Sequence, residues 1–480
     1  MKHPLRLIVL VMLSLVPVAC APPVYDNPVA VMMNTHESPH LRLAAAEQAE
    51  QKLPDDDKRL ASLRSLTWER GHPAELRTFA IDSLVRHNEA DAKKYLAKSI
   101  ALVNNWETIQ HLLDVAVRRK WVDFTPAIVR CYSRTASAYP DDTKRPEAGA
   151  LLELNPGRTI DDIVFDVFAH DPQADVNERA AAWTLMNRLV ADPEKLLTLL
   201  RNVKATDPLV LDLQAAATDL HVTADSKETI AWLQSLRAAD HQRFWAQAKQ
   251  AVASLTDEQR RGLELRHIPL LVHLRAANDP ALSMTRAQLL GNATGHIVSQ
   301  DHFNKSAGYD GGNPDRNQTL AHWQSRLSWG DLLVMHTVIR LMNDPTARAV
   351  IFQQADADVK DTGSEYGGLL AWTDANQLIV KPYTPMLRKH NLVYYSSEQL
   401  TLDSYFALAH FHLHAQKYEN AQWAGPGRGD FERIADTQRY NGILFTCIDP
   451  NRINVDFYCH APGSAASADG ICVDLGTITR

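Results

Sequence analysis

Apolar residues recur at intervals of three and four through most of residues 41–290, which is the period of one face of an α-helix. Within residues 72–84, for example, Leu76, Phe79 and Ala80 fall on one face. The preceding residues have no such period. The pattern therefore predicts a tether over residues 22–40 and a helical region over 41–290.

Two segments of this region open in the same way, with a short turn followed by an Arg placed shortly before an Ala. They are residues 72–80 and 177–183, and they resemble the helices of HEAT repeats. In such repeats, stacked helix pairs bury a core between neighbours and present one extended face, which would suit a protein partner. An irregular helical domain without repeats explains the pattern equally well, and both interpretations stay open.

The pattern changes after Asn343. Residues 291–342 predict a linker loop followed by a helix, whereas later segments have the short apolar runs that are typical of strands. These runs are residues 365–372, 404–414, 440–448, 452–458 and 471–475. The chain is therefore expected to be multidomain, with an all-α N-terminal region and an α/β domain at 343–480 built on a mixed sheet flanked by helices.

Composition fits a folded protein with more than one core: 480 residues, 45% hydrophobic and 22% charged. The formal net charge is -7 and no long run of Lys or Arg occurs, so no nucleic-acid partner is expected.

The amino terminus has the layout of a secretory signal over residues 1–21. Basic residues precede an apolar run at 7–16, and the small pair Ala19-Cys20 follows. Cleavage before Cys20 would leave a lipidated cysteine as a membrane anchor, whereas cleavage at Ala19-Cys20-Ala21 would release a free protein. We favour the lipoprotein. Both interpretations predict an exported bacterial protein, either periplasmic or membrane-anchored.

Three histidines alternate at the end of one predicted strand, at positions 410, 412 and 414. Residues two apart on a strand project to the same side, so His412 and His414 can both offer a ring nitrogen to one metal ion. The pair His410 and His412 satisfies the same spacing and remains an alternative.

A carboxylate downstream can complete the set. Asp430 opens a helix after a glycine-rich turn, and as a third ligand it would leave a fourth position for water, as in catalytic zinc sites. Such chemistry also needs a carboxylate outside the ligand set to move protons, and Glu365 is the candidate.

The motifs Glu365-Tyr-Gly-Gly-Leu-Leu, His412-x-His414 and Pro426-x-x-x-Asp430, in this order, resemble those of the JAB/MPN (JAMM) metallopeptidases. The resemblance covers about the last 130 residues. It implies Zn²⁺ held by His412, His414 and Asp430, with Glu365 as general acid/base in cleavage of a peptide or isopeptide bond. A peptide or protein would be the substrate.

Gly427 stands where that family has a serine that helps stabilise the oxyanion. Arg428 or a backbone N–H of the same turn is expected to substitute for it, and Trp423 in the long preceding loop is expected to line a substrate groove. The missing hydroxyl keeps an alternative open, in which the domain is a catalytically inactive lipoprotein scaffold that mediates protein–protein interaction.

Cysteine spacing predicts one disulfide. Cys459 and Cys472 flank the loop at 461–470 symmetrically, and an exported protein permits such a bridge.

Overall fold

The computed structural model describes residues 24–480 except 137, 140, 173, 191, 304–316, 387–393, 395, 432–440 and 461–469. The predicted signal segment and Cys20 lie outside the described residues. Among the described helices, none combines the length and the apolar character needed to cross a bilayer. The chain divides into two compact units, residues 1–158 and 159–480.

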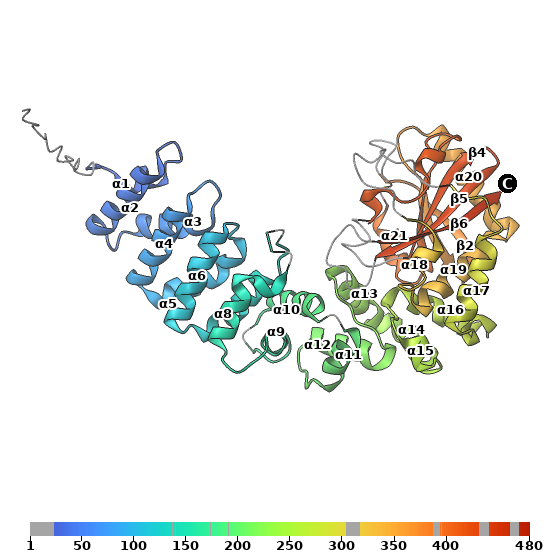
Figure 1. Cartoon of the computed structure of the whole chain (residues 1–480), viewed down its shortest axis with the longest axis horizontal. Coiled ribbons are helices and arrows are strands. Elements are labelled where there is room, and N and C mark those ends of the chain that lie inside the picture. The colour runs from blue at the N-terminus through green and yellow to red at the C-terminus, as the bar shows by residue number, and fades with distance from the viewer. Residues whose placement is uncertain are drawn as a thin grey trace, which may run out of the picture. The chain divides into compact units, whose positions relative to one another are not determined.

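The first unit is helical (Figure 1). Its α-helices are α1 (Pro28–Met33), α2 (Pro39–Lys52), α3 (Asp57–Trp68), α4 (Ala74–His87), α5 (Glu89–Ser99), α6 (Trp106–Arg119), α7 (Thr125–Tyr132) and α8 (Pro146–Leu154). The expected face of α4 is confirmed, since Leu76 and Ala80 are fully buried. Residues 22–40 are not simply a tether, because α1 lies within them and buries Met32.

Buried arginines close the ends of neighbouring helices. Arg77, on α4, donates to the carbonyl oxygens of Thr67 (3.1 Å) and His72 (3.0 Å), next to the end of α3. Arg179 donates in the same way to the carbonyl oxygens of Phe168 (2.7 Å) and Asp171 (2.5 Å). The last carbonyls of a helix lack partners within that helix, so each guanidinium satisfies groups that would otherwise be buried without a hydrogen bond. The two segments that resemble HEAT helices thus share this contact.

In the second unit, most helices precede the first strand in the chain, and one helix, α21, lies between two strands. They are α9 (Ile160–Ala169), α10 (Val176–Leu189), α11 (Pro193–Asn202), α12 (Pro208–Ala215), α13 (Lys227–Arg237), α14 (Gln242–Ala253), α15 (Asp257–Arg260), α16 (Ile268–Ala276), α17 (Arg286–Ile297), α18 (Leu320–Trp323), α19 (Trp329–Met342), α20 (Pro345–Lys360) and α21 (Glu398–Ser404). The helices from residue 159 onward therefore cluster with the sheet, and the division of the chain falls after Arg158 instead of near residue 290.

The described strands form one mixed six-stranded sheet, as expected for the C-terminal domain. They are β1 (Gly367–Trp372), β2 (Leu378–Tyr383), β3 (Ala409–His414), β4 (Gly442–Asp449), β5 (Arg452–His460) and β6 (Gly470–Thr479). Their order is β2-β1-β3-β4-β5-β6, in which β3 and β4 are parallel and the other neighbours are antiparallel. Helices α17, α18 and α19 contact β6, α20 contacts β2, and α21 contacts β1 (Figure 1).

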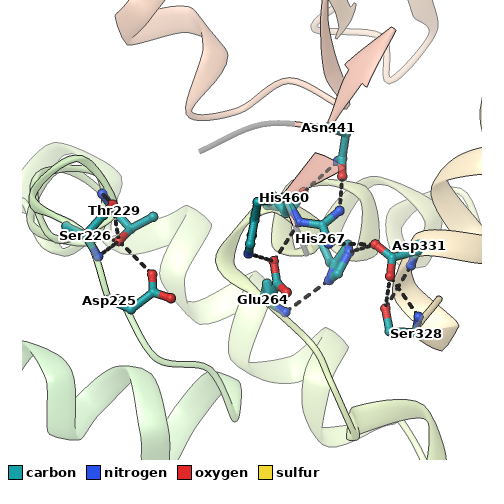
Figure 2. A network of polar contacts seen from close by, with 10 residues as sticks. Asp225, Ser226, Thr229, Glu264, His267, Ser328, Asp331, Asn441 and His460 are labelled. Carbon is teal, nitrogen blue, oxygen red and sulfur yellow. Dashed lines mark hydrogen bonds and ion pairs between the residues drawn. The ribbon is translucent and has the colours of Figure 1, made fainter. Parts of the chain in front are cut away.

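A buried polar network joins the helices to the sheet (Figure 2). Arg266, before α16, forms ion pairs with Asp331 of α19 (2.6 Å) and with Glu264 (2.7 Å). Its Nη1 also donates to Asn441 Oδ1 at the start of β4 (2.6 Å), and Glu264 pairs with His460 at the end of β5 (3.2 Å). Each charge in this interior therefore has an opposite charge beside it, which is what a buried ion needs.

Removing one charge from this buried network should destabilise the fold, because the remaining charges lose their partner. Asp331→Asn is expected to lower the free energy of unfolding by about 3–5 kcal/mol, because Arg266 would lose its fully buried counter-charge and keep only Glu264, whose side chain is partly exposed. Burial opposes ionisation of Asp331, yet Arg266 and His267 hold its pKa far below the usual value. The carboxylate therefore stabilises the fold above about pH 4, and this contribution is lost as the pH falls further.

Denaturant unfolding of the wild-type chain and of Asp331→Asn at several pH values measures the difference in their free energies of unfolding. Asp301→Asn is the control, since its ion pair with Arg452 is exposed and should contribute less than about 1 kcal/mol. An equal loss in the two variants would contradict the role given to the buried network.

Candidate metal centre

The end of β3 supplies two imidazoles to one side of the sheet. His412 and His414 are two residues apart on this strand, both are nearly buried, and their ring centroids lie 5.3 Å apart. The strand begins later than the sequence predicted: Ser404 ends α21, and the first strand residue is Ala409. The alternation of the histidines is unaffected, because it depends only on the strand's last residues.

Asp430 reaches the same place from the glycine-rich turn. Its Oδ2 accepts the backbone N–H of Gly427 (2.8 Å), and its Oδ1 lies 3.3 Å from Nε2 of His412. His412, His414 and Asp430 each offer one ligand atom, and these atoms all lie within 4.8 Å of one another. The predicted convergence of these three side chains is thus present. Within the described part of the chain, His410 is not a member of this group.

Each of the two imidazole rings also has a polar contact at its Nδ1 atom. The carbonyl oxygen of Trp423 lies 2.8 Å from Nδ1 of His414, and the hydroxyl of Tyr458 lies 3.4 Å from Nδ1 of His412. A carbonyl oxygen can only accept a hydrogen bond, so Nδ1 of His414 carries the hydrogen and donates to it. In the neutral ring, Nε2 then keeps its lone pair for a metal. Trp423 therefore serves this site through its backbone, a role that the identity of the side chain does not indicate.

Glu365 lies on the same face as the histidines. Gly367 pairs with His412, and Leu413 N donates to Tyr366 O (2.9 Å), so Glu365 is two residues beyond the pairing partner of His412. Burial raises the pKa of this carboxyl to about 7, against the opposing effect of His412. A carboxyl with such a pKa can both accept and release a proton near neutrality.

Two amide side chains in the long loop hold Glu365 in place, and the sequence offered no pattern that singled them out. Gln416 Nε2 donates to Glu365 Oε1 (3.1 Å). Asn420 Nδ2 in turn donates to Gln416 Oε1 (2.6 Å) and to the carbonyl oxygen of His414 (3.0 Å). The loop thus links the carboxylate to one of the ligands.

A second buried carboxylate, Asp358 of α20, was also missed. Its Oδ2 accepts the backbone N–H of Tyr366 (3.1 Å), next to Glu365. Burial, together with the nearby Glu365, raises the pKa of Asp358 to about 7. Two Asp residues, Asp356 and Asp358, lie near the end of this helix, and the sequence pattern does not single out the buried one.

The predicted disulfide is wrong. Cys459 pairs with Ile471 and Cys472 pairs with Tyr458, so the two sulfurs project to opposite faces of the β5–β6 ladder. None of the four described cysteines forms a disulfide, all four are buried, and Cys472 packs against Phe431, Leu444 and Tyr458. The reason is that β5 continues through Cys459 to His460 and β6 begins at Gly470, so both cysteines lie within paired strands.

Gly427 contributes its backbone N–H to Asp430, as described, and Arg428 is exposed at the start of the helical turn that follows. The roles proposed for Gly427, Arg428 and the Trp423 side chain toward a substrate remain predictions.

Comparison with protein-family models, with curated proteins and with solved structures finds no match to this chain. The two-histidine, one-aspartate group is compatible with a JAMM motif, and the geometry alone supports that resemblance.

Metal uptake tests the group directly. We expect the purified chain to bind one Zn²⁺, and His412→Ala or Asp430→Ala to abolish this binding, whereas His410→Ala should retain it. Elemental analysis after dialysis measures the stoichiometry. Equal loss in all three variants would place His410 among the ligands.

Zinc affinity should rise with pH. Despite burial, Asp430 raises the pKa of His412 to about 9 in the metal-free protein, and an imidazole must lose its proton to bind a metal. The apparent affinity is therefore expected to increase about tenfold per pH unit below pH 9. Competition with a calibrated chelator between pH 6 and pH 8 measures the slope, and an affinity independent of pH would contradict the assignment of His412.

Glu365→Gln should stabilise the metal-free protein at alkaline pH. The pKa of Glu365 is raised from 4.5 to about 7 on folding, so its ionisation costs stability only as the pH rises through this range. We expect a gain of about 1–3 kcal/mol at pH 8 and little gain at pH 4. Unfolding curves in EDTA at both pH values test this, with a pH-independent gain as the contrary outcome.

Proposed function

We propose that this protein is a zinc-dependent hydrolase that cleaves an amide bond in a peptide or protein, as the JAB/MPN metallopeptidases do. The observation that carries the proposal is the convergence of His412, His414 and Asp430 on one point, with Glu365 on the same face of the sheet.

The donor set fits zinc. Two imidazoles and one carboxylate are ligands that zinc accepts, and three protein ligands are typical of catalytic sites, whereas structural sites use four. The backbone contact on His414 is the kind of support that metal-binding histidines need. When bound, zinc would supply a water molecule with a pKa near neutrality and would polarise the substrate carbonyl.

The residues of the chain would supply the rest of the chemistry. Glu365 would take the proton from the attacking water and deliver it to the leaving amine nitrogen, since its pKa lies near 7. The amide of Gln416 and the backbone N–H of Tyr394 donate to this carboxylate and fix its direction. Arg428 or a backbone N–H of the turn would stabilise the oxyanion.

Export and attachment are part of the proposal. The layout of residues 1–21 supports a secreted or Cys20-lipidated bacterial protein that acts in the periplasm or at its membrane. The first helical unit would then hold a substrate or a protein partner.

A scaffold without activity is the second candidate. It is favoured by one observation, the glycine at position 427, which removes a hydroxyl that the resembling family uses for catalysis.

Activity against a peptide library tests the hydrolase. We expect turnover that requires zinc, and a loss of at least about 10²-fold in kcat for Glu365→Gln with zinc still bound. Mass spectrometry of the products measures it. Full turnover by Glu365→Gln would refute the proposed proton transfer, and zinc binding without turnover of any peptide would favour the scaffold.

Gly427→Ser should raise the rate if the missing hydroxyl limits it. One oxyanion donor is worth about 10²–10³ in kcat, so a gain of at least about tenfold is expected. Gly429→Ser is the matched control, because a Cβ at Gly429 meets nothing within 4 Å. An equal change in both variants would show that the hydroxyl at 427 has no special role.

A further inference from the structure

A row of polar side chains continues across the sheet from the metal centre. His414 pairs with Thr446 on β4, and Thr446 pairs with Asn454 on β5. Two residues further along β5, Asp456 pairs with Asp474 on β6. Directly paired residues share a face, and so do residues two apart on a strand, so these side chains lie on the face that carries His414.

These side chains are buried, and several of their oxygens have no hydrogen-bond donor. Thr446, Asn454 and Asp456 are fully buried, and Asp474 is 4% exposed. Among the described residues, no group donates to Asn454 Oδ1 or Asp456 Oδ1, and Thr446 Oγ1 has no partner. Asn454 Nδ2 donates to Asp456 Oδ2 (3.0 Å), which places the amide group next to the carboxylate.

Gly425, in the loop before Asp430, contacts this row, and the neighbouring Gln318 adds one more oxygen. The backbone N–H of Gly425 donates to Asp456, and Gly425 has a φ of +91°, which favours glycine. A Cβ there would lie 3.1 Å from Gln318 Oε1, a buried oxygen that also lacks a donor within the described ranges. The backbone of Gln318 accepts from Asp474 N (2.9 Å), so this residue touches both the loop and β6.

The row has an excess of negative charge. Burial raises the pKa of Asp456, and Asp474 raises it further; burial also raises the pKa of Asp474. The imidazole of His302 lies beside Asp474, with Nδ1 at 3.0 Å from Asp474 Oδ2, and its side chain is 35% exposed. Asp474 also accepts the backbone N–H groups of Phe303 and Gly476. Asp456 receives only neutral donors, so its charge is left without a counter-charge.

We propose that Thr446, Asn454, Asp456 and Gln318, with Asp474 beside them, form a second metal site that takes a hard divalent cation, Ca²⁺ before Mg²⁺. Every group that lacks a donor here is an oxygen, and carboxylate, amide and hydroxyl oxygens are ligands that hard cations prefer. Ca²⁺ accepts irregular sets of 6–8 oxygens, whereas Mg²⁺ requires a near-ideal octahedron that this flat row does not present.

Buried water is the competing explanation for unpaired acceptors. Water would satisfy these oxygens but would leave the charge of Asp456 in place, so the carboxyl would instead have to keep a proton. The two explanations predict opposite effects of Asp456→Asn. If a cation binds, the variant loses its ligand; if a proton is retained, the variant replaces a neutral acid by a neutral amide of the same shape.

Isothermal titration of the full chain with CaCl₂, after the first centre is loaded with Zn²⁺, tests the site. We expect one Ca²⁺ per chain, weaker binding of Mg²⁺, and an affinity for Ca²⁺ that falls at least about tenfold in Asp456→Asn. Asp374→Asn, a change at an exposed acid, should bind Ca²⁺ normally. His412→Ala should also bind it, because this site does not depend on the proposed zinc function.

Thr446→Val provides a second variant that keeps both carboxylates and the side-chain shape, and it should weaken Ca²⁺ binding as well. Calcium should also raise the unfolding temperature of the wild-type chain and not that of Asp456→Asn. The proposal is overturned if the wild-type chain binds no Ca²⁺ by titration, or if Asp456→Asn and Thr446→Val bind it as well as Asp374→Asn does.

Discussion

The register of β3 between its two neighbours is the constraint on which the site depends. On one side, Gly367 pairs with His412 and brings Glu365 to the metal-facing side of the sheet. On the other side, His414 pairs with Thr446 and begins the polar row. A shift of one residue would turn every one of these side chains to the opposite face. Gly367 makes the close approach feasible, because a Cβ there would lie 2.6 Å from the carbonyl oxygen of Phe411.

That register is held from outside the sheet. The charged network around Arg266 reaches Asn441 immediately before β4 and His460 at the end of β5, so the helices fix the same end of two adjacent strands (Figure 2). Asn441 Nδ2 also donates to the carbonyl oxygen of Leu408, just before β3. The segment around Arg266 and helix α19 are therefore part of the framework of the site, and they belong to the same compact unit as the sheet.

The parts of the site that were predictable are those set by local periodicity. The alternation of His412 and His414 follows from strand geometry alone, and Asp430 was recognisable from its place at a helix start. The helical and sheet regions were predictable for the same reason. The Trp423 carbonyl was not, because backbone groups leave no trace in residue identity, and Gln416 and Asn420 lie in an irregular loop.

Features that depend on the pairing of distant strands could not be predicted from the sequence. The row through Asn454 and Asp456 arises only when three strands align, and the disulfide failed because β5 runs on through Cys459 and turns its sulfur away from Cys472. The division of the chain after Arg158 has a related origin, since packing between distant helices and strands leaves no local pattern.

X-ray absorption spectroscopy of the zinc-loaded protein identifies the ligands of the metal. We expect a four-coordinate shell of two imidazole nitrogens and two oxygens at about 2.0–2.1 Å, one of the oxygens from Asp430. A shell that contains sulfur, that has three or more imidazoles, or that consists of oxygens alone would contradict this expectation.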